Sequence, residues 1–174
     1  MNNVIKYEDG RQHMNHGFKL LIELVPAGAW NLSVYQLLKK RKQLHKWRKL
    51  KEELVKKEGR RCWICDTEGG RLEAHEFWEY DDATHVQKLA AIHHICSLCH
   101  KIKHIGFWCH TTDGKRSLAK TGLTKAVLLQ HFCKVNGCSL AEFEAHERHA
   151  FSVWRERSTH EWIQDFGDYT SVLS

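Results

Sequence analysis

Several features that mark other classes of protein are missing from this 174-residue sequence. It has a single proline, Pro26, and no apolar run approaches the roughly 18–20 residues that span a bilayer, which excludes a membrane-spanning protein. Its start lacks the charged, apolar and small-residue order of a secretory signal, so we do not expect secretion. With no internal repeat, 42% apolar residues and 28% charged residues, the composition is typical of a soluble globular protein.

Metal-ligating side chains and positive charge, by contrast, are abundant. The chain has seven cysteines, fourteen histidines and seven tryptophans, and its 27 lysines and arginines outnumber 21 acidic residues. In a chain that is not secreted, this many cysteines and histidines indicate metal binding rather than disulfides.

Hydrophobic periodicity predicts helices on both sides of the cysteine-rich centre. Apolar residues at helical spacing predict one helix over residues 33–57, with Ser33 or Asn31 as its cap and Gly59 at its end. We expect residues 111–121 to form a polar loop.

Three further segments carry local signals. Residues 123–135 predict a helix, and the capping-box spacing of Ser139 and Glu142 predicts another helix that follows. The apolar run 20–25 before Pro26 is short enough to be either a buried strand or an arm.

Positive charge is concentrated on the helix predicted over 33–57 and just beyond it. Clustered cations of this kind favour contacts with phosphate groups, so we expect a nucleic acid as partner, DNA in the first instance. The alternative is a solvated helix face. The side chains expected to bind nucleic acid are Lys39, Lys40, Arg41, Lys42, Lys46, Arg48, Lys49, Arg60 and Arg61.

Two C-x2-C pairs, thirty residues apart, predict a structural zinc site with four thiolate ligands. An ion that closes so long a loop becomes part of the folding energy. The other three cysteines have no ligand spacing of their own, although nearby histidines leave a second zinc site open as an alternative. The predicted ligands are Cys62, Cys65, Cys96 and Cys99.

Histidines near these pairs predict a second kind of metal site. His100 and His104 follow the second pair and lie on one face if the segment is helical, so both can bind one divalent ion. His75 lies on a strand predicted over 71–77, which can turn its ring toward the same ion.

The combined pattern resembles a known enzyme family. The chain resembles the zinc-knuckle form of the HNH, or His-Me finger, nucleases. The shared order is C-x2-C, then a strand with a histidine, and then C-x2-C-H-x3-H. The matching segments are CWIC, LEAHEFWEYDD and CSLCHKIKHIG, within residues 60–106, and LVPAGAW and WRERSTHEW look more loosely like parts of bacterial and phage HNH-type proteins. The resemblance implies a β-hairpin and an α-helix that hold one catalytic ion. It also implies a cytoplasmic protein of a bacterial cell or phage-infected host.

The resemblance also implies a role for each matching residue. His75 matches the general base that activates water, and His100 and His104 match the residues that hold the catalytic ion, Mg²⁺ or Mn²⁺. A register-shifted alignment instead makes His75 a metal ligand and Glu76 the base.

Two positions depart from the family pattern. Members usually have a metal ligand just before the strand histidine, where this chain has Ala74. The central asparagine that orients the base aligns with Ala91, and His93 or His94 is a candidate substitute.

We therefore expect an α+β fold with a small zinc-bound β-hairpin–helix (ββα-metal) core surrounded by helices. The predicted division is an N-terminal arm and basic amphipathic helix over 1–59, the HNH-like core over 60–106, and a C-terminal helical segment over 107–174 that packs on the core. The expected function is a metal-dependent endonuclease that hydrolyses phosphodiester bonds. The alternative is an inactive HNH-like zinc module that binds nucleic acid or a protein partner.

Overall fold

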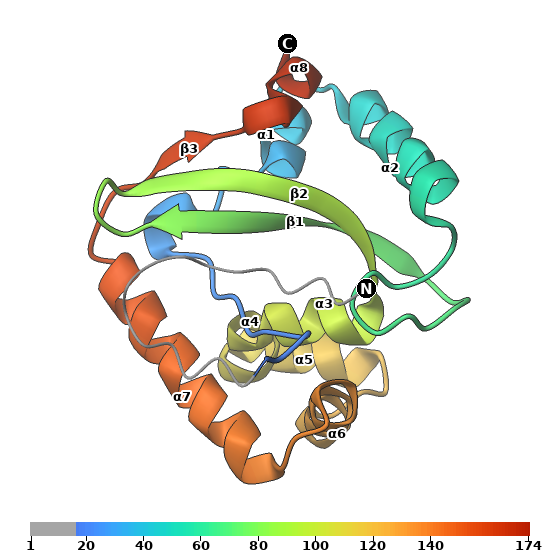
Figure 1. Cartoon of the computed structure of the whole chain (residues 1–174), viewed down its shortest axis with the longest axis vertical. Coiled ribbons are helices and arrows are strands. Elements are labelled where there is room, and N and C mark those ends of the chain that lie inside the picture. The colour runs from blue at the N-terminus through green and yellow to red at the C-terminus, as the bar shows by residue number, and fades with distance from the viewer. Residues whose placement is uncertain (1–16) are drawn as a thin grey trace. The chain divides into compact units, whose positions relative to one another are not determined.

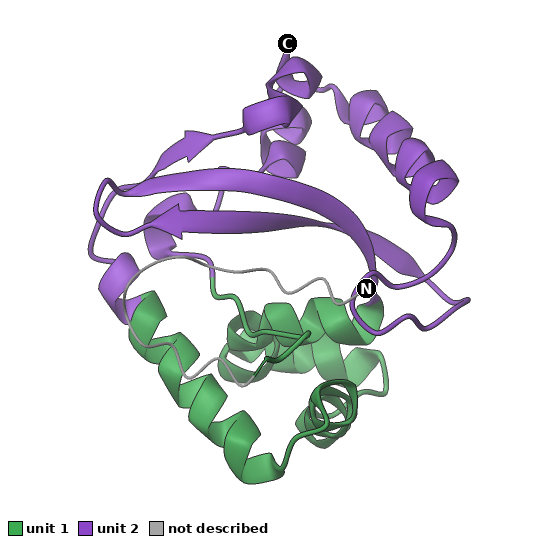
Figure 2. Cartoon of the chain, in the orientation of Figure 1, with its two compact units in different colours: residues 1–24, 97–154 green, residues 25–96, 155–174 purple. Residues whose placement is uncertain are grey.

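Residues 17–174 are described by the structure, a computed structural model, and fall into two compact units. Among these residues, one unit holds 17–24 and 97–154, and the other holds 25–96 and 155–174 (Figure 2). Helices together with one small sheet confirm the expected α+β class. The three-part division expected from the sequence stays a prediction.

A long antiparallel hairpin forms the centre of the unit with residues 25–96 and 155–174 (Figure 1). Strand β1 (Leu72–Asp81) pairs with β2 (Val86–Cys96), and a short parallel strand, β3 (Ile163–Asp165), pairs with the start of β2. The strand predicted over 71–77 is present and runs on to Asp81. Partners in the register share a sheet face, so the pairing decides which side chains can meet.

The single helix predicted over 33–57 is wrong, because the chain forms two helices there, α1 (Val34–Lys40) and α2 (Leu44–Glu58). Lys42 lies between them with φ of 59°, a left-handed conformation that an α-helix interior does not accommodate. The predicted caps are confirmed. The Ser33 side chain accepts a hydrogen bond from the Gln36 amide at 3.2 Å, and Gly59 ends α2 with φ of 75°.

The apolar stripe of these two helices packs on one face of the hairpin. Leu50 and Leu54 of α2 share a buried cluster with Ile92 of β2. Three short elements complete the unit: η1 (Ala27–Ala29), η2 (Gly167–Tyr169) and α8 (Thr170–Leu173), the last of which adds Leu173 to the same cluster.

Helices make up the second unit. They are α3 (Ser97–Lys103), α4 (Ile105–His110), α5 (Thr112–Lys120), α6 (Lys125–Asn136) and α7 (Leu140–Arg157), the last of which ends in the other unit. The helix predicted over 123–135 is thus confirmed as α6. None of the helices in residues 17–174 is both long and apolar enough to cross a membrane.

Local capping explains one wrong prediction and one confirmed prediction in the helical unit. The segment 111–121 was expected as a loop but forms α5, because the Thr111 side chain accepts the Gly114 amide at 3.0 Å and starts a helix in a polar sequence. The capping box is confirmed. The Glu142 amide donates to Ser139 Oγ at 3.3 Å, and the Ser139 amide donates to Glu142 Oε2 at 2.8 Å.

The apolar run 20–25 forms neither helix nor strand and is an extended arm. The Ile22 amide donates to His146 Nε2 at 3.0 Å, and the Glu23 amide donates to the Lys103 carbonyl at 3.2 Å. Lys103 is only 2% exposed, and its Nζ lies 2.6 Å from Glu23 Oε1. The arm thereby supplies the anion that a buried ammonium group on α3 requires.

Candidate functional site

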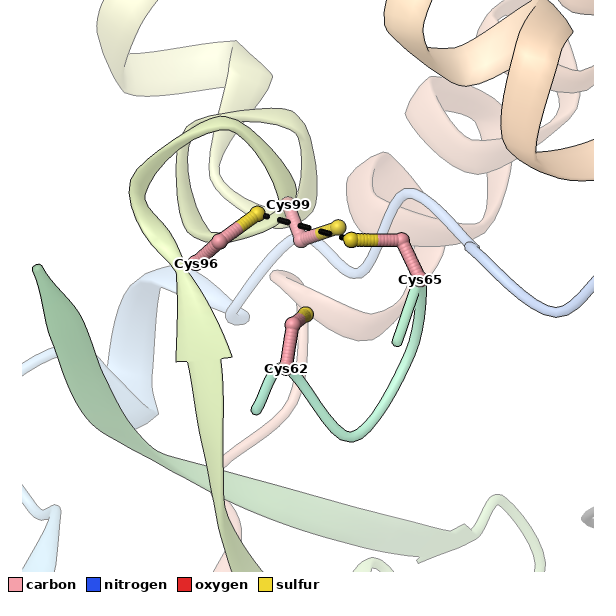
Figure 3. A group of neighbouring side chains, drawn as sticks. All are labelled: Cys62, Cys65, Cys96 and Cys99. Carbon is pink, nitrogen blue, oxygen red and sulfur yellow. Dashed lines mark hydrogen bonds between the residues drawn. The ribbon is translucent and has the colours of Figure 1, made fainter. Parts of the chain in front are cut away.

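Four cysteine thiols form the first cluster of possible metal ligands (Figure 3). Each offers one sulfur, and the four atoms lie within 4.8 Å of one another. Cys62 and Cys99 are fully buried, whereas the other two cysteines are half-buried. The four members are the predicted ligands Cys62, Cys65, Cys96 and Cys99.

Backbone hydrogen bonds build the first cysteine pair into a tight turn. The Cys62 amide donates to the Thr67 carbonyl at 3.0 Å, and the Asp66 amide donates to the Cys62 carbonyl at 2.9 Å. Asp66 has a left-handed φ of 57°, which reverses the chain just after Cys65. The second pair needs no such turn, because it begins at the last residue of β2 and ends in the first turn of α3.

These sulfurs fit a zinc ion. A tetrahedron with Zn–S bonds of about 2.3 Å places its sulfurs about 3.8 Å apart. The sulfurs of Cys65 and Cys96 lie 3.7 Å apart. The cluster therefore can hold a metal ion such as zinc, as the spacing of the cysteines predicted.

Another side chain, which the sequence interpretation did not connect to this cluster, contacts one of its sulfurs. His131 Nε2 on α6 lies 3.3 Å from the Cys99 sulfur, a distance suited to an N–H···S hydrogen bond to a thiolate. No sequence spacing links these positions. The second zinc site that was left open is not among the groups of possible ligands in residues 17–174, since neither group contains Cys109, Cys133 or Cys138.

Three histidines form the second cluster of possible ligands. His75, His100 and His104 each offer one ring nitrogen, and these atoms lie within 4.8 Å of one another. His100 lies in α3, and the His104 amide donates to the His100 carbonyl at 3.3 Å, so the expected helical i, i+4 relation is present. His75 is 6% exposed on β1, and the structure therefore brings together the three histidines that the sequence singled out.

Glu76, the other residue predicted to take part in catalysis, is not a member of either group. Its two carboxylate oxygens accept the amides of Val34 and Tyr35, each at 3.2 Å, at the start of α1. Neighbours on a strand point to opposite faces, which explains why Glu76 and His75 separate. Burial raises the pKa of Glu76 to about 7, although the Tyr35 and Val34 amides and a side-chain hydrogen bond from Trp78 oppose the shift.

The register distinguishes the two histidines considered as substitutes for the missing asparagine. His93 is the cross-strand partner of His75 and so shares its face. Its Nδ1 lies 2.7 Å from Glu58 Oε1, and its ring stacks on Trp63.

His94 points the other way, as the partner of Ala74. It is 1% exposed, and among the described residues neither ring nitrogen has a hydrogen-bond partner. Burial lowers the pKa of His94, as do the nearby cations Lys51 and Arg60, against the opposing effect of Glu58.

The predicted nucleic-acid-binding cations all lie on α1, α2 and the segments that follow these helices. Eight of the nine are exposed, and Lys46 is half-buried. Two of them have partners. The Arg41 guanidinium donates to the Leu173 carbonyl, and Arg61 pairs with Glu68 at 2.6 Å. The remaining exposed members can meet an anion without first breaking a bond described here.

Comparison with known proteins identifies no relative. No protein-family model, no curated protein and no solved structure matches the chain.

Proposed function

We propose that this protein is a metal-dependent endonuclease of the HNH type, which hydrolyses phosphodiester bonds of nucleic acid, DNA in the first instance. The observation that carries the proposal is the convergence of His75, His100 and His104 within 4.8 Å. With His100 and His104 as the ligands, coordination positions would stay open for water and phosphate, and an open position is typical of catalytic metal sites rather than structural ones. The hairpin followed directly by α3 is the arrangement that the resemblance implies.

In this proposal His100 and His104 hold the divalent ion. The ion would stabilise the charge that develops on the scissile phosphate and on the leaving oxygen. Imidazole donors suit zinc and other late transition metals better than magnesium, which prefers oxygen ligands. We therefore propose a transition metal, with manganese ahead of magnesium of the two ions first expected.

His75 then acts as the general base. Its ring accepts a proton from a water molecule as the water oxygen attacks phosphorus and the bond to the leaving oxygen breaks. Histidine suits this step because its ordinary pKa lies near neutral pH. Phe77, two residues along the same face of β1, packs against the His75 ring edge-on at 5.2 Å and restricts its orientation.

The exposed cations of α1 and α2 would bind the phosphate backbone. Such contacts are independent of sequence and weaken with salt, so we propose non-specific or structure-directed binding. The site of action proposed is the cytoplasm of a bacterial cell or of a phage-infected host.

The experiment that tests the proposal is cleavage of supercoiled plasmid by the purified protein with added Mn²⁺, Zn²⁺ or Mg²⁺. We expect metal-dependent nicking that His75→Ala abolishes, while His45→Ala, an exposed histidine on α2, nicks at the wild-type rate. Absence of nicking by the wild type at every metal would contradict the proposal. That result would favour the inactive zinc module as the alternative.

A binding measurement separates the two possible roles of His75. If it is the base, His75→Ala loses nicking but still binds the second metal ion through His100 and His104. If it is a third ligand, the variant loses the ion as well. Equilibrium dialysis with Mn²⁺ or Co²⁺ on zinc-loaded protein distinguishes these outcomes.

A further inference from the structure

The indole of Trp63 is an exposed aromatic side chain on a hydrogen-bonded turn. It lies between the ligands of the first cysteine pair and remains 38% exposed. Its amide donates to the His94 carbonyl at 2.8 Å, and the flanking cysteines belong to the four-thiol cluster. The backbone that carries the indole is therefore fixed from both sides.

One face of the indole is already covered. The His93 ring lies parallel to it, with 3.8 Å between ring centroids and 1° between planes. His93 is itself held by Glu58, whose carboxylate lies 2.7 Å from Nδ1 and is only 7% exposed. Since the imidazole occupies one face, a ligand can stack on the indole only from the opposite face.

The surroundings of this face favour an anionic ligand. Arg60 and Arg61 precede the knuckle directly and are both exposed, although Arg61 pairs with Glu68. His93 is also the register partner of His75, so the stacked pair lies on the face of the hairpin that carries the proposed base. An aromatic face beside cations is the combination that binds a base together with its phosphates.

We infer that Trp63, backed by His93 and Glu58, is a stacking platform for an unpaired nucleobase next to the proposed cleavage site. The inference rests on nucleic acid being the partner, as in the proposed function, and it adds a preference for single-stranded or locally opened strands. A preformed, rigid ring loses little side-chain entropy when a base stacks on it. The uncovered face of the indole is planar and can stack with any base.

The test is a binding measurement without added metal, by fluorescence anisotropy. The probes are a labelled single-stranded oligonucleotide and a strand of the same length made of abasic residues, which keeps the phosphates but has no bases. We expect the wild type to prefer the base-bearing strand, and Trp63→Leu to weaken that binding by roughly 5- to 150-fold, the range for one base–aromatic stack. Binding of the abasic strand should not change.

Two variants serve as controls. Trp30→Leu removes another indole, 50% exposed in the same unit, and should change neither affinity. Arg60→Ala should weaken the binding of both strands by the same factor. Trp63→Phe keeps a planar ring and should retain part of the base preference. If Trp63→Leu fails to hold zinc, a fluorescence measurement with 2-aminopurine in the oligonucleotide replaces it. We expect the wild type to quench this fluorescence, and Trp63→Phe to quench it less.

Several results would overturn the inference. They are equal affinity of the wild type for both strands, an unchanged base preference in zinc-loaded Trp63→Leu, and no binding of the oligonucleotide at all. The cleavage assay stays independent of these results. A protein that stacks bases but does not nick plasmid supports the platform and contradicts the nuclease, and the reverse outcome contradicts the platform alone.

Discussion

The two ligand clusters differ in donor chemistry and in the number of ligands. Four thiols complete a tetrahedron, so an ion held there has no position left for water or substrate. The three imidazoles of the other cluster cannot complete a tetrahedron by themselves, and nitrogen donors of this kind favour a borderline transition metal. The comparison separates a cluster suited to a structural ion from a cluster that, in the proposed function, would hold the catalytic ion.

The closed cluster also differs in how the chain reaches it. One cysteine pair is held in a turn by hydrogen bonds between Cys62 and Thr67, and the other pair spans the junction of β2 and α3. Removing the ion leaves buried sulfurs without a common partner. The open cluster takes its histidines from β1 and from α3 and the turn that ends it, elements whose hydrogen bonds do not require an ion.

The largest effect should therefore follow the loss of the thiolate site. We expect Cys62→Ser, or removal of zinc by a strong chelator, to abolish cooperative thermal unfolding, because a structural zinc ion contributes about 10–16 kcal/mol of apparent binding energy. Circular dichroism and zinc content measure the result. Cys138→Ser, outside the cluster, should keep one zinc ion and a normal transition. A stable, zinc-free Cys62→Ser protein would contradict the structural role.

A smaller and more selective effect should follow the loss of one histidine ligand. We expect His104→Ala to keep the zinc of the thiol cluster and to unfold within a few degrees of the wild type, yet to lose the second metal ion and plasmid nicking. Cobalt titration separates the clusters, because only thiolate ligands give intense sulfur-to-metal charge-transfer bands. His45→Ala should titrate like the wild type. A His104→Ala protein that still binds two ions per chain would show that His104 is not a ligand.

Spacing along the sequence was enough to predict the local part of each cluster. Joining the two cysteine pairs used the four-ligand preference of zinc, and joining His75 to His100 and His104 used the predicted strand and the family resemblance. Two C-x2-C pairs and an i, i+4 histidine pair define their own geometry once the segment is a knuckle or a helix. The α+β class and the caps at Ser33 and Ser139 are also confirmed. The pair spacings and the caps depend on neighbours within a few residues.

Other features were missed or predicted wrongly because they depend on a distant contact or on a single backbone torsion or cap. The contact of His131 with Cys99 joins positions 32 residues apart, and no spacing rule connects them. The helix break at Lys42 and the helix over 112–120 depend on single backbone torsions and one cap, which outweigh apolar periodicity. Glu76 was considered as the base on a register-shifted alignment. Strand alternation directs its carboxylate to the start of α1, and its catalytic role stays a prediction.

The smallest expected effect concerns this carboxyl group, which lies outside both clusters. Burial raises the pKa of Glu76 from its ordinary 4.5 to about 7. Because the pKa is higher in the folded protein, the stability that this group contributes is complete below about pH 4.5 and is lost as the pH rises through about 7. A shift of this size corresponds to roughly 3 kcal/mol.

Glu76→Gln removes the titration, so the free energy of unfolding of the wild type relative to this variant should fall by up to that amount between about pH 5 and about pH 8. Urea denaturation measures it, with Glu79→Gln, exposed on the same strand, as a control that follows the wild type. If the difference in free energy of unfolding between the wild type and Glu76→Gln stays constant with pH, Glu76 has the same pKa in the folded and unfolded chains.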